Sequence, residues 1–347
     1  MFVLILTTCT LCTVFIVKGQ TDETFNVIGG ALYIGDLSAL VQYAIMILMS
    51  MIMLVMVLVM IVMAAESARR VVKVLGTEST LESLADGITE VADGSIEFDH
   101  VDFSYAGDDE KCALTGADLK IASGETIGVL GGTGSGKTTL VQLIPRLYDV
   151  TEGSVKVGGR DVREYDLECL RKNIAMVLQK NVLFSGTIKE NIRWGKQDAT
   201  DEEIVAACKL AQADEFISQM PDGYDTYIEQ GGTNVSGGQR QRLCIARALI
   251  ANPKIIIFDD STSAVDTKTD ALIRKAMAES LPHATKIVIA QRVSSFEDAD
   301  RIIVMDGGKI SAVGTHEELM KSSEIYREAY EIQNKKSDDG EGEHAIS

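Results

Sequence analysis

Nine consecutive residues have the types and the order needed to hold a phosphate group. They are Gly131, Gly132, Thr133, Gly134, Ser135, Gly136, Lys137, Thr138 and Thr139. Glycines let successive backbone N–H groups converge on phosphate oxygens, a lysine reaches the β- and γ-phosphates, and a hydroxyl binds Mg²⁺. The preceding run (126–130) predicts a buried strand, and the following one (140–147) predicts a helix whose start favours an anion. This context favours a P-loop over a glycine-rich turn.

A second stretch supplies the carboxylate that a P-loop site needs. Residues 255–258 form an apolar run that predicts a buried parallel strand, and Asp259 follows it directly. A carboxylate there would lie beside the P-loop and hold Mg²⁺, mostly through water, because the ion keeps part of its hydration shell. A strand that ends in aspartate is common, but together with the P-loop it predicts a nucleotide site.

A third stretch predicts another anion-binding position. Ser236, Gly237, Gly238 and Gln239 open an amphipathic pattern that predicts a helix over 236–251. The serine can cap this helix, and the two glycines leave its first amides bare. A P-loop protein with a second phosphate-binding helix start is expected to make two kinds of nucleotide contact.

Composition limits the class of protein. The chain has 347 residues, 46% of them hydrophobic, and a formal charge of −18, which excludes a nucleic-acid partner bound through a basic face. The six cysteines form no disulfide framework, and the four histidines form no cluster with metal-ligand spacing. Cys9 and Cys12 are spaced like a redox or metal pair, but they lie in an apolar run, where small residues of a membrane helix are the favoured interpretation.

The N-terminal part predicts membrane helices. Residues 37–65 include no charged side chain, and a helix of that length exceeds the roughly 30 Å hydrocarbon core of a bilayer. Arg69, Arg70 and Lys73 follow, so this end and the nucleotide domain are expected in the cytoplasm. Residues 1–17 are also apolar but lack a basic start, which favours a short or truncated membrane helix over a signal peptide.

The remaining pattern predicts the domain organisation. We expect a linker at 76–94, a nucleotide-binding domain at 95–334 and a disordered acidic tail at 335–347. The expected fold is α/β, a P-loop NTPase core of mainly parallel strands. It has a helical subdomain at about 181–241 and a small antiparallel sheet near Ile96 and Tyr105, and about two transmembrane helices precede it.

The P-loop, the Ser236 motif and the strand ending at Asp259, in this order along the chain, resemble the ATP-binding cassette (ABC) transporter family, exporter type. The resemblance implies that Tyr105 stacks on adenine and that Gln179 touches Mg²⁺ and faces the membrane domain. It also implies that Glu229 belongs to the exporter X-loop and Asp266 to a D-loop at the dimer interface. In this family, ATP lies between the P-loop of one subunit and the signature motif, here Ser236 to Gln239, of the other.

Two positions depart from the family pattern. Asp260 stands where catalytically complete members have the glutamate that polarises the attacking water, and Gln291 stands where they have the switch histidine. A carboxylate held about 1 Å back costs on the order of a hundredfold in rate. The signature is intact apart from Val235 in place of leucine. The chain thus resembles the degenerate-site half of a heterodimeric exporter; a slowly hydrolysing homodimer and a non-catalytic regulatory subunit remain alternatives.

Length is the third departure. Half-transporters of this type carry six membrane helices before the nucleotide domain, so we expect an N-terminally truncated half-transporter of a multi-pass cell-membrane protein. Its expected ligands are ATP and Mg²⁺, and its expected partners are a second half-transporter, membrane lipid and an exported substrate. Multidrug, lipid and peptide export all remain open. Soluble ABC proteins of DNA repair or translation do not fit the apolar run or the acidic charge.

Overall fold

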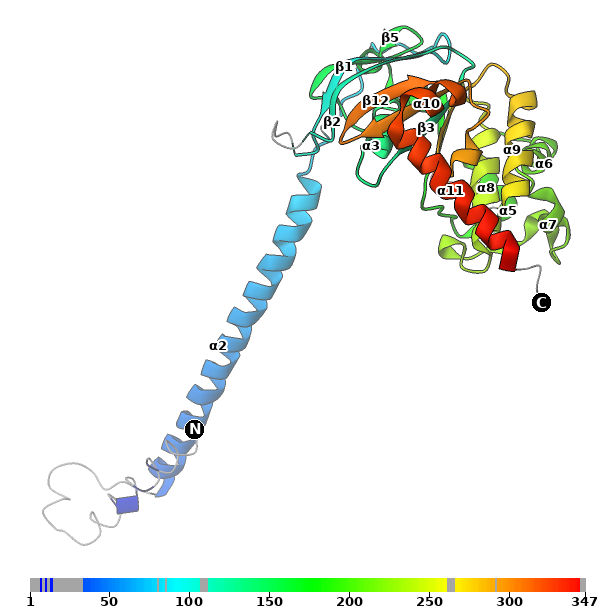
Figure 1. The fold of residues 1–347 in the computed structure, drawn as a ribbon. Coiled ribbons are helices and arrows are strands. Elements are labelled where there is room, and N and C mark those ends of the chain that lie inside the picture. The colour runs from blue at the N-terminus through cyan, green and yellow to red at the C-terminus, as the bar shows by residue number, and fades with distance from the viewer. Residues whose placement is uncertain are drawn as a thin grey trace, which may run out of the picture. The chain divides into compact units, whose positions relative to one another are not determined.

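The computed structural model divides the chain into two units, Met1–Thr80 and Leu81–Ser347 (Figure 1). The residues that the structure describes are 7, 10, 13–14, 34–79, 81–84, 86–106, 112–260, 266–290 and 292–343. Most of the predicted membrane helix at 1–17 therefore lies outside the described residues.

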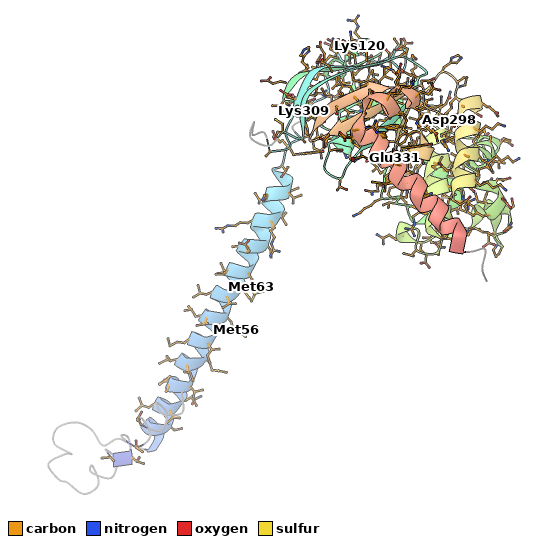
Figure 2. The ribbon with its side chains drawn as sticks, viewed as in Figure 1. Met56, Met63, Lys120, Asp298, Lys309 and Glu331 are labelled. Atoms are coloured by element: carbon orange, nitrogen blue, oxygen red, sulfur yellow. The ribbon has the colours of Figure 1, made fainter. Side chains whose placement is uncertain are left out.

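The first unit contains the long helix α2 (Ile34–Leu75). Of this helix, Ser38–Leu75 is long and apolar enough to cross a membrane, as the uncharged run at 37–65 predicts. Met56 and Met63 project outward from α2, whereas the residues labelled on the second unit are charged (Figure 2). Because residues 37–65 present no charged side chain on any face of α2, this part of the helix has the character of a membrane segment rather than of an amphipathic surface helix.

The core of the second unit is a six-stranded sheet in the order β12-β11-β3-β10-β9-β6. Its strands are β3 (Thr126–Gly131), β6 (Ile174–Val177), β9 (Ile255–Asp259), β10 (Thr285–Ile289), β11 (Arg301–Asp306) and β12 (Lys309–Gly314). All neighbours pair in parallel except β11 and β12. Every residue of β9 and β10 is buried, in agreement with their high content of β-branched residues. The predicted α/β fold with mainly parallel strands is confirmed.

A second sheet packs beside the first, in the order β2-β1-β4-β5. Its strands are β1 (Ile96–Phe103), β2 (Leu114–Ile121), β4 (Glu152–Val157) and β5 (Arg160–Asp161). All of its pairs are antiparallel, as predicted for the segment from Ile96. A short antiparallel pair, β7 (Gly186–Thr187) and β8 (Tyr227–Ile228), belongs to the helical region.

Helices cover the sheets, and α5 to α8 form the predicted helical subdomain (Figure 1). The α-helices are α3 (Lys137–Leu143), α4 (Leu167–Lys172), α5 (Ile188–Arg193), α6 (Asp201–Leu210), α7 (Asp214–Ser218), α8 (Gly237–Leu249), α9 (Thr267–Ser280), α10 (His316–Ser322) and α11 (Glu324–Glu343). The 3₁₀ turns are η2 (Val162–Glu164), η3 (Gly223–Asp225), η4 (Gln230–Gly232) and η5 (Val293–Ser295). Capping boxes at Thr187, Thr200 and Ser236 satisfy the N-cap and N3 amides of α5, α6 and α8.

The segment predicted as a linker at 76–94 differs from that expectation. Its second part packs on the nucleotide-binding unit, because Ile88 bridges Tyr165 and the Val91 side chain is buried. The ammonium of Lys254 donates to the carbonyl oxygens of Val91 and Ala92. Because of these contacts, residues 81–94 pack as part of the second unit rather than as a linker.

The C-terminal segment also differs. The prediction of a disordered tail at 335–347 is wrong for residues 335–343, since α11 continues to Glu343. Its start is held on the core by Tyr326, which is fully buried and lies 2.7 Å from His316 Nδ1 through its hydroxyl. Once a helix start is held in this way, each added residue gains a hydrogen bond without a new nucleus. The composition of residues 335–347 gives no information about this anchor at Tyr326.

Candidate nucleotide-binding site

The P-loop connects the end of β3 to the start of α3, as predicted. Gly134 and Gly136 have φ values of 80° and 93°, a region that favours glycine. A Cβ atom at Gly131 would lie 2.5 Å from the Met305 carbonyl oxygen and from Ser135 Oγ, so a side chain does not fit there. The helix covers Lys137–Leu143 instead of the predicted 140–147, because Pro145 has no N–H for the carbonyl four residues earlier.

Lys137 lies against the backbone of the loop. Its ammonium donates to the carbonyl oxygens of Gly131 and Gly132 at 2.8 and 2.7 Å and lies 3.3 Å from Ser135 Oγ. Burial lowers the pKa of this ammonium, and the nearby carboxylates of Asp259 and Asp260 oppose that shift. The cation is therefore held where a phosphate bound by the loop would meet it.

Thr138 and Asp259 join the P-loop to β9. The hydroxyl of Thr138 donates to Asp259 Oδ1 at 3.3 Å, and the Asp259 side chain is buried. Burial raises the pKa of the Asp259 carboxyl, Asp260 adds to the rise, and Thr138 and Lys137 oppose it. A buried carboxylate beside a hydroxyl is a hard oxygen donor set of the kind that Mg²⁺ prefers. These two residues fit the magnesium ion that the sequence implies.

Asp260 and Gln179, far apart in the sequence, meet at this site. Gln179 Nε2 donates to Asp260 Oδ2 at 3.2 Å, and the Asp260 backbone N–H donates to the Ile289 carbonyl at the end of β10. Asp260 has a φ of 49°, a left-handed conformation that aspartate tolerates better than most residues. Sequence reasoning placed each residue near the metal or the water but missed their contact, for which the spacing in the chain carries no signal.

Tyr105 lies beside the P-loop helix. Its ring is 55% exposed, and its hydroxyl donates to Gln142 Oε1 at 3.3 Å and lies 3.1 Å from Thr139 Oγ1. The ring also packs against Phe103 and Tyr148. Sequence reasoning missed Tyr148 and Gln142; the only signal was an aromatic residue shortly after the predicted helix.

Ser236 begins the third predicted stretch and caps α8. Its Oγ accepts from the Gln239 backbone N–H at 3.2 Å, and the Gln239 side chain accepts from the Ser236 N–H at 2.9 Å. Ser236 and Gly237 are exposed, whereas Val235 is buried, so an apolar residue other than leucine fills that position. The glycines at 237 and 238 add no side chains to this exposed helix start.

The two predicted interface residues stabilise their own loops. Glu229 Oε2 accepts from the Thr233 hydroxyl at 2.8 Å, and Asp266 caps α9 by accepting from the Thr269 N–H at 2.9 Å. This backbone hydrogen bond is the largest cause of the lowered pKa of Asp266. Gln291 and residues 263–265 of the predicted D-loop lie outside the described residues.

Comparison with known proteins identifies this arrangement. Residues 114–263 match the family described as ABC transporter. These residues form an ABC transporter domain. A solved structure, described as a bacterial Atm1-family ABC exporter with ATP bound, is similar with a TM-score of 0.73 and 34% identity. The match covers 88% of this chain and 54% of that one.

Curated relatives agree with this ATPase domain. The uncharacterized ABC transporter ATP-binding protein YfiB of Bacillus subtilis is 41% identical over 310 residues, which are 89% of this chain and 53% of YfiB. The putative multidrug export ATP-binding/permease protein YgaD of the same organism is 46% identical over 241 residues, 70% of this chain and 41% of YgaD. This chain thus spans about half the length, or less, of these relatives. The predicted resemblance to ABC transporters of the exporter type is confirmed.

Proposed function

We propose that this chain is the ATP-binding and ATP-hydrolysing subunit of an ABC exporter. The observation that carries the proposal is the contact between Thr138 Oγ1 and Asp259 Oδ1, which joins the P-loop to the buried carboxylate. The loop amides and Lys137 would bind the phosphates, and Thr138, Asp259 and Gln179 would hold Mg²⁺. When bound, the ion neutralises charge on the transferred phosphoryl group. The apolar helix α2 would anchor the subunit in the lipid bilayer, with Arg69 and Arg70 on the cytoplasmic side.

Hydrolysis at the chain's own site is proposed to be slow. Asp260 reaches one methylene less far than glutamate, and its carboxylate is engaged by Gln179. Gln291 replaces the histidine that the family uses as a switch. ATP bound at Lys137 would therefore mainly stabilise the closed arrangement of two nucleotide domains. The same two residues favour the alternative of a non-catalytic regulatory subunit.

The intact signature motif supports a role for this chain at another subunit's site. Ser236 and the bare amides of α8 would face the γ-phosphate of ATP held by the P-loop of a second half-transporter. That partner would carry the competent glutamate and histidine, so a heterodimer is favoured over a homodimer. The exported substrate would bind in the assembled membrane domain.

A groove lies beside Gln179 and its neighbours, the segment that the family resemblance identifies as the Q-loop, and is the proposed route to the membrane domain. It has a volume of about 1400 Å³, and Leu178, Lys180 and Val182 are among the residues that line it. Trp194 also lines the groove, and its ring stacks on that of Phe184 with centroids 4.7 Å apart; both residues are exposed. Gln179, between the lining residues, reaches Asp260. We propose that a cytoplasmic segment of the membrane domain docks here, so that its movement reaches the ATP site through the Q-loop.

The test restores the family residues at the two positions. The double variant Asp260→Glu and Gln291→His should raise ATP turnover of this chain on its own, without the partner, by about ten- to a hundredfold. Phosphate release with Mg²⁺-ATP measures this, with Lys137→Ala added as the inactive background. A turnover that stays at the wild-type value contradicts the proposal that these substitutions limit hydrolysis.

A further inference from the structure

Two exposed aromatic rings lie together beside the P-loop helix. Tyr105 and Tyr148 are 55% and 42% exposed, with ring centroids 5.1 Å apart and planes at 88°. The buried ring of Phe103 contacts both, at 4.8 Å from Tyr105 and 5.6 Å from Tyr148. Edge-to-face pairs at these distances are attractive beyond the area they bury. The Tyr105 ring is thus packed against two other rings although more than half of it is exposed.

The hydroxyl of Tyr105 is attached to the P-loop helix at the same time. It donates to Gln142 Oε1 at 3.3 Å and lies 3.1 Å from Thr139 Oγ1, and both partners belong to α3. An exposed tyrosine without such contacts samples several rotamers. Here two ring contacts and two hydroxyl contacts restrict the side chain before a ligand arrives. A ring that is ordered in advance loses less freedom when a base stacks on it, and affinity rises accordingly.

We propose that Tyr148 and Gln142 are positioning residues for the adenine base of ATP. They hold the Tyr105 ring in the orientation on which the base stacks, and Gln142 ties that ring to the helix that binds the phosphates. The inference rests on the proposed binding of ATP at Lys137. It adds a second tyrosine and a glutamine to a site in which the sequence pattern identified only Tyr105.

The experiment compares ATP with inorganic tripolyphosphate, which has the phosphates but no base. Both are titrated calorimetrically, with Mg²⁺, into the full chain in lipid nanodiscs. Tyr148→Leu should weaken ATP about three- to tenfold, the cost of ordering one side chain, and leave tripolyphosphate unchanged. Tyr148→Phe keeps the ring and should restore the wild-type affinity. Gln142→Leu should weaken ATP about two- to threefold, again without an effect on tripolyphosphate.

Leu147→Ala is the matched control, because Leu147 is an exposed neighbour in the same segment and should leave both affinities unchanged. An equal loss for ATP and tripolyphosphate in Tyr148→Leu would mean local structural damage and overturn the inference. So would an unchanged ATP affinity in both Tyr148→Leu and Gln142→Leu. A wild-type chain that binds neither ligand would overturn the nucleotide site itself, and this inference with it.

Discussion

The P-loop and the signature motif, the two nucleotide-contacting regions of this ATPase domain, are built in different ways. At the P-loop, Ser135, Thr139 and Asp259 are buried, and Lys137 lies near two carboxylates. At the signature, Ser236 is exposed and its capping hydrogen bonds stay within the first turn of α8. The P-loop region therefore depends on charged side chains from two distant segments, Lys137 in the loop and Asp259 and Asp260 at the end of β9, whereas the signature depends on a local helix cap.

This difference separates two functions within one chain. Buried charges that perturb one another are typical of a site that holds a charged ligand. An exposed, self-satisfied helix start can keep its structure without a ligand and present free amides to another subunit. The comparison predicts that substitutions at the P-loop change binding of ATP by the isolated chain, while substitutions at the signature change only the assembled dimer.

The largest expected effect is at Lys137. Lys137→Ala removes the cation that would bind the β- and γ-phosphates, and Mg²⁺-ATP affinity of the isolated chain should fall on the order of a hundredfold, as for charge-assisted hydrogen bonds. Equilibrium binding measures this directly. Ser236→Asp serves as the matched variant at the other region and should leave this affinity unchanged. Equal losses in the two variants would remove the distinction between the regions.

The next effect concerns Ser236 in the assembled dimer. Ser236→Asp keeps a good helix cap but directs a carboxylate at the partner's ATP, and like-charge repulsion should lower dimer turnover by ten- to about a hundredfold. Ser236→Ala loses the cap instead, which costs about 1 kcal/mol and lowers the unfolding midpoint by about 2–4 °C. Turnover and thermal unfolding separate the two effects. If the dimer with Ser236→Asp kept the wild-type turnover, the phosphates of the partner's ATP could not lie opposite Ser236.

The smallest expected effect is a change in the stability of the ligand-free protein when Asp259 is replaced. Since burial raises the pKa of this carboxyl, the folded protein binds its proton more tightly than the unfolded chain. Its contribution to stability is present below the ordinary pKa and is lost as the pH rises through the raised pKa. At neutral pH, Asp259→Asn should therefore raise the unfolding midpoint by a few degrees without ligand.

With Mg²⁺-ATP, the unfolding midpoint of Asp259→Asn should instead lie below that of the wild type, because the variant lacks the carboxylate that would hold the metal. Differential scanning calorimetry with and without Mg²⁺-ATP, with ATP plus EDTA as the control, checks both halves. A ligand-free variant that unfolds below the wild type would show that Asp259 stabilises the empty site, contrary to its buried environment.

Much of this comparison was predictable from the sequence. The P-loop, the strand ending at Asp259 and the Ser236 cap are local patterns, since spacing along one segment determines which amides and side chains meet. The continuous apolar runs of β9 and β10 likewise indicate strands covered on both faces. Local sequence patterns were therefore sufficient to predict the family resemblance and the fold.

Contacts between distant segments were not predictable in this way. The hydrogen bond between Gln179 and Asp260, and the packing of Tyr148 on Tyr105, depend on how loops from different strands meet at the sheet edge. The continuation of α11 to Glu343 depends on the buried anchor at Tyr326. Each is a tertiary effect that overrides local composition.

The most direct test of the asymmetric dimer is ATP turnover by this chain alone and after mixing with a full-length partner half-transporter. The account predicts negligible turnover by the chain alone and turnover on mixing. That turnover should be lost when this chain carries Ser236→Asp and only reduced when it carries Lys137→Ala, which weakens closure of the dimer without touching the competent site. Substantial turnover by the chain alone that Lys137→Ala abolishes would contradict the account, because Asp260 would then be a working substitute for the missing glutamate.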